Sequence, residues 1–147
     1  MIKILLLIFI SGSLIADKPD LLFKRSGKEL VALTLLMEAR GEEKGFRGMA
    51  SAAQVIRNRM NHHDFPDMAR AVVLELNQFS CWNNLKNDNY YEDLLKLPEA
   101  KAALAYAHDV IRNRKIDPRL NGELFYQNTK ITGKKIKGIV IGNHTFY

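Results

Sequence analysis

Apolar residues recur at helical spacing along most of the chain, which predicts a largely helical protein. The first predicted helix covers residues 28–39, and Gly41 follows it as a helix-terminating glycine. A second helix is predicted over residues 46–60, where small apolar residues share one side. Pro66 suits the first turn of a third helix, which is expected to end near Leu76.

The pattern changes in the second half of the chain. Residues 83–97 are polar and irregular, with one helical turn expected at "YYEDLLK", and Pro98 opens a fourth helix that ends in "VIRNR". Beyond Pro118, the runs "GELFYQN", "KIKGIVIGN" and "HTFY" are β-prone, with a turn predicted at Thr132-Gly133. The sequence therefore predicts one mostly helical α+β domain with a small C-terminal β element.

The N-terminal segment has the pattern of a secretory signal peptide. Within residues 1–16, Lys3 precedes an uncharged apolar run, which is shorter than the roughly 20 residues that span a bilayer. Cleavage after Ser13 or Ala16 would release an exported domain, residues 20–147, to the periplasm or the cell wall. An uncleaved segment would instead tether the domain to a membrane.

The composition narrows the class of partner. At 147 residues, 47% of them hydrophobic, the chain fits a single globular domain, and we expect a monomer. Its net charge of +6 favours anionic polymers, such as cell-wall glycan, nucleic acid or an acidic membrane surface, although it can serve solubility alone. Export argues against nucleic acid as a partner. Cys81 is the one cysteine, so no intrachain disulfide is possible.

One carboxylate stands where an apolar residue would pack better. In "LLMEARGEEKGF", Glu38 lies at the end of an apolar helical run, where the negative end of the helix dipole disfavours a charged acid. Leu35, Met37 and Phe46 would reduce its solvation further, whereas Arg40 would favour the charge. A glutamic acid that keeps its proton can donate it to a glycosidic oxygen. The alternative is a surface acid at a helix end.

Five ordered motifs resemble the signature of the cell-wall hydrolase family of the spore cortex-lytic enzymes. These are E-A-R-G-E at residues 38–42 followed by "GMASAAQVIRNR", then "FPDMARAVV", "QFSCW", "DPRLNGELFYQN" and "IGNHTFY". The resemblance covers residues 29–147. The chain departs from the family pattern at Glu123 and Gln127, where small and His residues are more usual.

The resemblance implies a lysozyme-like, lytic-transglycosylase-like domain that acts on peptidoglycan, with Glu38 as the catalytic acid. It also implies cleavage of the β-1,4 bond between N-acetylmuramic acid and N-acetylglucosamine. Glu38 would then act as base toward the sugar's own C6 hydroxyl, which leaves a 1,6-anhydro end. This chemistry needs one carboxyl group and no cofactor, because the substrate supplies the nucleophile.

Three other functions remain open. A muramidase would use a second carboxylate, for which Glu42 is a candidate. An N-acetylmuramoyl-L-alanine amidase would use zinc, and a non-catalytic wall-binding module would not need Glu38. We predict no metal, because the adjacent His62 and His63 of "NHHD" are poorly spaced to bind one ion and no H-E-x-x-H motif is present. The two R-N-R segments are expected to be helix-end cations.

The glycan-binding surface should combine aromatic rings, on which sugars stack, with neutral amides that bind hydroxyl and acetamide groups. The segments "NQFSCWNN", "LFYQN" and "GNHTFY" offer both kinds of side chain, whereas Phe125 is expected to pack in the core. The predicted substrate-binding residues are Glu42, Gln78, Phe79, Trp82, Tyr126, Asn128 and His144.

Overall fold

The computed structural model describes residues 22, 24–42, 47–128, 133 and 136–147. The predicted signal peptide, the predicted start of the second helix at Phe46 and the predicted turn at Thr132 lie outside these residues. Within the described part of the chain, no helix is both long and apolar enough to cross a membrane.

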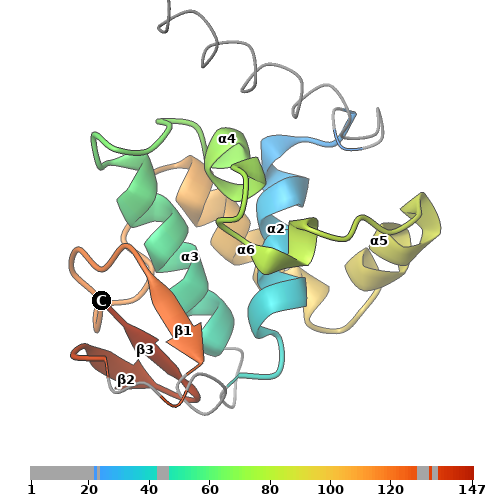
Figure 1. Cartoon of the computed structure of the whole chain (residues 1–147). Coiled ribbons are helices and arrows are strands. Elements are labelled where there is room, and N and C mark those ends of the chain that lie inside the picture. Colours follow the sequence, from blue (N-terminus) through green and yellow to red (C-terminus); the bar gives the residue numbers. More distant parts are fainter. Residues whose placement is uncertain (1–21, 23, 43–46, 129–132, 134–135) are drawn as a thin grey trace, which may run out of the picture.

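The described residues form a mostly helical α+β fold, which confirms the predicted class (Figure 1). Within the described part of the chain, five α-helices and a short 3-10 helix precede a small sheet near the C-terminus. The elements are α2 (Gly27–Ala39), α3 (Arg47–Met60), α4 (Ala69–Leu74), η2 (Ser80–Trp82), α5 (Asp88–Leu95), α6 (Ala100–Ile111), β1 (Tyr126–Asn128), β2 (Ile139–Ile141) and β3 (His144–Phe146).

Helix α2 lies at the centre of the molecule, with α3, α4, α5, α6 and η2 packed around it (Figure 1). A capping box begins this helix, because the Ser26 hydroxyl accepts from the amide of Glu29 and the Glu29 carboxylate accepts from the amide of Ser26. Every residue from Leu30 to Leu36 is buried. The sequence indicated an apolar stripe, but the helix is enclosed on all sides, as its continuous apolar run allows.

The later helices differ from their predicted bounds. Helix α4 begins at Ala69 and not at Pro66, because Met68 is still in an extended conformation. Helix α5 extends over two turns where one was expected, since the Asn87 side chain caps it by accepting from the amide of Tyr90. Helix α6 ends at Ile111, and Asn113 then takes a left-handed φ of 54° that a helix cannot continue.

The sheet is antiparallel in the order β1–β3–β2 and lies beside α3 (Figure 1). Tyr126 pairs with Phe146, and Asn128 pairs with His144. Because alternate residues share a face, Tyr126, Asn128 and His144 lie on the same side of the sheet. The turn between β2 and β3 falls at Gly142, whose φ is 59°, within the run "KIKGIVIGN" that the sequence analysis assigned to a single β-prone piece.

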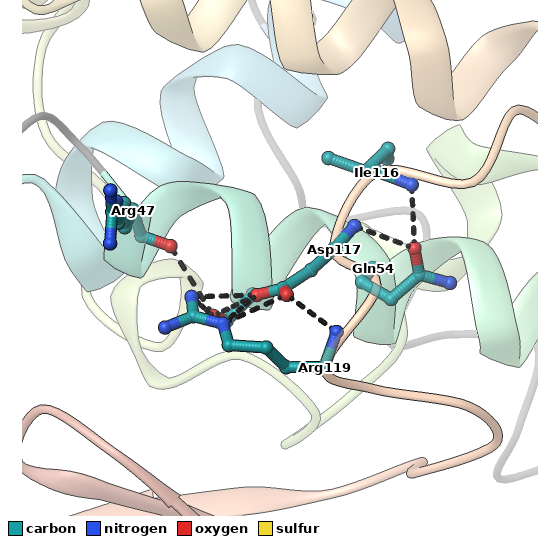
Figure 2. A network of polar contacts seen from close by, with 6 residues as sticks. Arg47, Gln54, Ile116, Asp117 and Arg119 are labelled. Carbon is teal, nitrogen blue, oxygen red and sulfur yellow. Dashed lines mark hydrogen bonds and ion pairs between the residues drawn. The ribbon is translucent and has the colours of Figure 1, made fainter.

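A buried polar network fixes the segment that leads into the sheet (Figure 2). Gln54 of α3 accepts hydrogen bonds from the amides of Ile116, at 2.7 Å, and Asp117, at 3.1 Å. The Asp117 carboxylate accepts from the Ser51 hydroxyl at 2.7 Å and pairs with the Arg119 guanidinium at 2.8 Å. Side chains of helix α3 therefore fix the position of the "DPRL" segment.

Helix α3 holds the next residues of the same segment through their backbone. The Asn58 amide donates to the carbonyl of Glu123 at 3.0 Å, and Arg59 Nε donates to the carbonyl of Leu124 at 2.7 Å. Tyr126 follows directly as the first residue of β1. The side chains of Asn58 and Arg59 in α3 thus fix the backbone directly before the sheet.

Candidate active site

A pocket of about 430 Å³ opens between the C-terminal end of α2, the segment before η2 and the sheet. Six predicted site residues line it: Glu38, Glu42, Gln78, Tyr126, Asn128 and His144. Four further residues complete the lining: Arg59, Asn77, Ser80 and Gln127. Residues from distant parts of the sequence are therefore brought together around two carboxylates.

Glu38 occupies the last turn of α2 and is half-buried. Its Oε1 accepts hydrogen bonds from the backbone amide of Cys81, at 3.0 Å, and from the Ser80 hydroxyl, at 3.3 Å. One helical turn earlier, the Thr34 hydroxyl accepts from Trp82 Nε1 at 3.0 Å. Because positions 34 and 38 share a face of the helix, η2 is held across α2 and orients the carboxylate.

The Cys81 thiol lies next to the same carboxylate. Burial raises the pKa of this thiol well above its ordinary value, and the charge of Glu38 and a hydrogen bond to it act in the same direction. The group therefore stays a thiol, which is a weak nucleophile. Its position makes it a neighbour of Glu38 and not a catalytic cysteine.

Phe79 and Trp82 do not lie on the pocket surface, where the sequence analysis placed them. Trp82 is 4% exposed, and its ring packs against Tyr91 at a centroid distance of 5.6 Å. Phe79 is 2% exposed and lies against the Arg59 guanidinium. The motif "QFSCW" sends these two rings into the core, while Gln78 on one side and Ser80 on the other line the pocket.

Glu42 forms the opposite wall together with the hairpin turn. Its Oε2 lies 3.4 Å from His144 Nδ1 and accepts from the amide of Asn143 at 3.3 Å. The ring of Tyr126 meets His144 edge to face at 5.2 Å. Glu42 also lies close to the first turn of α3. Gly48 makes this possible, because a Cβ at that position would lie 2.3 Å from the Cβ of Glu42.

Arg59 lies in the last turn of α3, where the sequence analysis expected a helix-end cation, but it is buried in the pocket wall. The residue is only 3% exposed. Its guanidinium lies 5.0 to 5.3 Å from the ring centres of Phe65, Phe79 and Phe125. Burial lowers the pKa of Arg59, and nearby groups, Tyr126 foremost, oppose that shift. An arginine remains charged under these conditions.

The Tyr126 hydroxyl is buried and has no hydrogen-bond partner among the residues that the structure describes. Burial raises the pKa of this phenol well above its ordinary value, the charge of Glu38 acts in the same direction, and Arg59 opposes them. The phenol therefore keeps its proton and remains a hydrogen-bond donor.

A comparison with protein families decides what this arrangement belongs to. A model of the Cell Wall Hydrolase family matches residues 43–147. The chain belongs to the Cell Wall Hydrolase family. The protein is thus a cell-wall hydrolase, and peptidoglycan is its class of substrate. No curated protein and no solved structure matches the chain.

The family match covers most of the pocket of this cell-wall hydrolase, from Arg59 to His144. Glu38 and Glu42 lie directly before the matched range. The structure links the two parts, because Cys81 and Ser80 hold Glu38, and the hairpin turn holds Glu42. The pocket therefore joins the matched region to the end of α2.

Some pocket residues of the cell-wall hydrolase were not predicted as substrate-binding residues. Asn77 has a left-handed φ of 61°, which Asn tolerates better than most residues and which turns the chain out of α4 toward η2. Its position directly before Gln78 was the available signal. Ser80 and Gln127 stand within predicted motifs, and Arg59 ends one of them. Side-chain direction, which a motif alone does not give, separates these residues from Phe79.

One possible group of metal ligands occurs among the described residues, and it lies outside the pocket. His62, His63 and Asp64 follow α3, with ligand atoms that all fall within 4.8 Å of one another. His63 and Asp64 are exposed. The prediction that the cell-wall hydrolase uses no metal stays a prediction.

Proposed function

We propose that this cell-wall hydrolase is a lytic transglycosylase that cuts the β-1,4 bond between N-acetylmuramic acid and N-acetylglucosamine. The observation that carries the proposal is the unequal state of the two pocket carboxylates. Glu38, at the end of the central helix, accepts hydrogen bonds from the Ser80 hydroxyl and the Cys81 amide of η2. Glu42 instead is paired with His144 and accepts a hydrogen bond from the amide of Asn143. Ordinary glycoside hydrolysis uses two carboxylates, so a pocket in which Glu42 is paired with a basic side chain favours the transglycosylase.

The chemistry needs Glu38 in two successive roles. In its protonated form, Glu38 donates the proton to the glycosidic oxygen as the bond to the anomeric carbon breaks. The carboxylate then takes a proton from the C6 hydroxyl of the same muramic acid residue, and that oxygen attacks the anomeric carbon. The product carries a 1,6-anhydro bond, and Glu38 regains its proton.

The residues around Glu38 support this cycle. Hydrogen bonds from the Ser80 hydroxyl and the Cys81 amide to Oε1 stabilise the carboxylate that exists between the two proton transfers. Gln78 and Asn128 line the pocket with neutral amides, which suit the hydroxyl and acetamide groups of a sugar. We assign Tyr126 and His144, which are in ring contact, to the wall that shapes the sugar site.

The cellular setting is part of the same proposal. We propose that residues 1–16 direct export and that the domain acts as a monomer in the periplasm or the cell wall. The peptidoglycan substrate of the family fits this location. An uncleaved N-terminal segment would hold the same domain at the membrane surface.

The decisive experiment is a digest of purified peptidoglycan, with the products identified by mass spectrometry. Wild-type protein should yield 1,6-anhydro ends. Glu38→Gln should lower the rate by about a thousandfold, since a general acid contributes in that range, and should leave thermal unfolding nearly unchanged. Glu42→Gln is the matched control, with a smaller loss of rate. A folded Glu38→Gln protein with near-normal turnover would refute the assignment.

The same digest separates the other functions. Reducing ends, together with equal losses for Glu38→Gln and Glu42→Gln, indicate a two-carboxylate muramidase. Freed peptides, with activity that a strong chelator removes and zinc restores, indicate the amidase. We expect activity to persist with the chelator. Binding to peptidoglycan without any product indicates a wall-binding module.

A further inference from the structure

Two of the residues that line the pocket carry buried polar atoms for which the described part of the chain offers no hydrogen-bond partner. They are Arg59 Nη1 and the Tyr126 hydroxyl. A buried donor without a partner is costly, and native structures contain few of them. Both residues flank the same space as Glu38. The pair is therefore best explained by a group that arrives with the substrate.

The protein contacts of Arg59 leave this donor unused. Nε donates to the carbonyl of Leu124, and the guanidinium lies close to the rings of Phe65, Phe79 and Phe125. Aromatic rings attract the cation but accept no conventional hydrogen bond from its edge. An acceptor in the pocket would complete the hydrogen bonding of the guanidinium.

A charged neighbour does not fulfil this role. Glu75 also has a buried carboxylate oxygen without a partner, and its charge acts on Arg59. Within the described residues, however, no hydrogen bond or ion pair joins Glu75 to Arg59. Glu75 does not line the pocket either. Its charge favours the buried cation, and Arg59 Nη1 remains available to a ligand.

We infer that Arg59 and Tyr126 together bind an amide carbonyl oxygen of the glycan beside Glu38, and so make the pocket selective for sugars that carry amide groups. This inference rests on the proposed function, because it names the substrate group that the same pocket recognises. A carbonyl oxygen has two lone pairs and can accept from both donors, whereas a hydroxyl brings a proton of its own that needs an acceptor. Peptidoglycan offers such oxygens in the acetamide groups and in the lactyl amide that joins the peptide.

Binding by the Glu38→Gln protein tests the inference without relying on cleavage. Three ligands of equal length are titrated by calorimetry: an N-acetylglucosamine tetramer, a cellulose tetramer with hydroxyl groups in place of the acetamides, and a peptidoglycan tetramer that carries its peptides. Each titration is repeated after Tyr126→Phe, which removes only the hydroxyl, and after Arg59→Met, which keeps an apolar stem among the rings. Arg57→Met, two residues earlier on α3, is the control.

We expect Tyr126→Phe and Arg59→Met each to weaken binding of an N-acylated ligand by about tenfold or more, in line with hydrogen bonds that involve a charged or buried partner. Binding of the cellulose tetramer should change less than about twofold, and Arg57→Met should change nothing. If the N-acetylglucosamine tetramer loses affinity, the acetamide is the group that Arg59 and Tyr126 bind. If only the peptide-bearing ligand loses affinity, that group is the lactyl amide.

Other results overturn the inference. If the substitutions weaken binding of all three ligands equally, Arg59 and Tyr126 act only on the fold. If binding is unchanged after Tyr126→Phe, the Tyr126 hydroxyl does not bind the ligand together with Arg59. Either result leaves the product analysis of Glu38 intact, so this inference and the proposed function fail separately. If no tetramer binds at all, the inference is contradicted, and the proposed function is decided by the product analysis alone.

Discussion

At the scale of single residues, the site depends on how η2 meets the central helix. Glu38 is placed by α2, but its carboxylate is oriented by the Ser80 hydroxyl and the Cys81 amide. The anchor of that short helix is Trp82, whose indole donates to Thr34 one turn before Glu38. The aromatic residue therefore serves the site from inside the core, by fixing the backbone that holds the acid.

This role makes Trp82→Phe a test of stability and not of glycan contact. The substitution removes the buried donor to Thr34 and part of the ring that packs on Tyr91. We expect the free energy of unfolding, measured with urea, to fall by about 1–3 kcal/mol. The affinity of the folded Glu38→Gln protein for a glycan tetramer should stay within about twofold when Trp82→Phe is added. A large loss of affinity without a loss of stability would contradict this role and would indicate that Trp82 contacts the glycan.

The contrast within "QFSCW" shows what a sequence can and cannot give for a site. Residue type predicted that the segment binds glycan, and the structure places it beside Glu38. Which side chains face the pocket depends on the turn that follows Asn77, whose left-handed backbone no periodicity predicts. Gln78 was assigned correctly to the pocket lining, whereas Phe79 lies under Arg59.

At the scale of elements, close packing between the end of α2 and the start of α3 sets the distance across the pocket. Any side chain at Gly48 would collide with Glu42. A Cβ atom added there would lie 2.3 Å from the Cβ of Glu42 and 2.8 Å from the Glu42 carbonyl oxygen. Glu42 in turn contacts the turn between β2 and β3. The glycine of the "GM" pair thus controls the position of the sheet relative to α2.

Gly48→Ala should consequently damage the site. Glu42 would have to move, which weakens its contacts with His144 and Asn143, and such overpacking commonly costs about 1–3 kcal/mol. We expect at least a tenfold loss of peptidoglycan cleavage, roughly the effect of such a displacement on a positioned site. Gly27→Ala in the first turn of α2 is the control, because its Cβ would meet Ile111 at an ordinary 3.6 Å. Equal effects of the two substitutions would contradict the packing argument.

The network on α3 makes a pH-dependent contribution to stability. Burial alone would raise the pKa of Asp117, but hydrogen bonds from Arg119 and Ser51 outweigh it and hold the pKa below the ordinary 3.8. Because the folded state binds the proton less readily than the unfolded state, this contribution is present above about pH 3.8 and is lost as the pH falls through the lower folded value.

Asp117→Asn should reveal that contribution. At pH 7 we expect the free energy of unfolding to fall by about 2 kcal/mol, since a buried group loses charge-assisted hydrogen bonds. The difference from wild type should shrink as the pH drops below about 3.8. Asp93→Asn is the control, because its exposed pair with Lys96 should contribute less than about 1 kcal/mol. A difference that does not depend on pH would show that Asp117 acts through shape alone.

The positions of the elements were predicted better than their ends. Hydrophobic periodicity located α2 and α3 because their apolar runs are long, and β-prone composition located the sheet. The ends of α4 and α6 depend on the backbone of Met68 and Asn113, which a local pattern does not determine. The network of Gln54, Ser51 and Asp117 was not foreseen either, because its partners are separated along the chain and meet only in the fold.

At the scale of the whole molecule, we expect the net charge and the pocket to interact with different parts of the same substrate. The net charge of +6 belongs to the chain as a whole, and Arg59, the cation in the pocket wall, is buried. Exposed cations attract the acidic groups of an intact wall over distances that salt screens at about 8 Å under physiological conditions. The neutral amides of the pocket act at contact distance, where salt has little effect.

Intact wall and a short uncharged glycan should therefore respond differently to salt. Between about 0.05 M and about 0.5 M NaCl, we expect binding to intact wall to weaken about tenfold, because the long-range attraction is screened. Cleavage of an uncharged glycan fragment should change less than about twofold, since its contacts are hydrogen bonds and ring packing. Sedimentation of wall fragments measures the first quantity, and product formation from the fragment measures the second. Equal sensitivity would mean that an exposed charge acts within the site itself. Arg40, which is exposed at the C-terminal end of α2 two residues after Glu38, would then be the first side chain to replace.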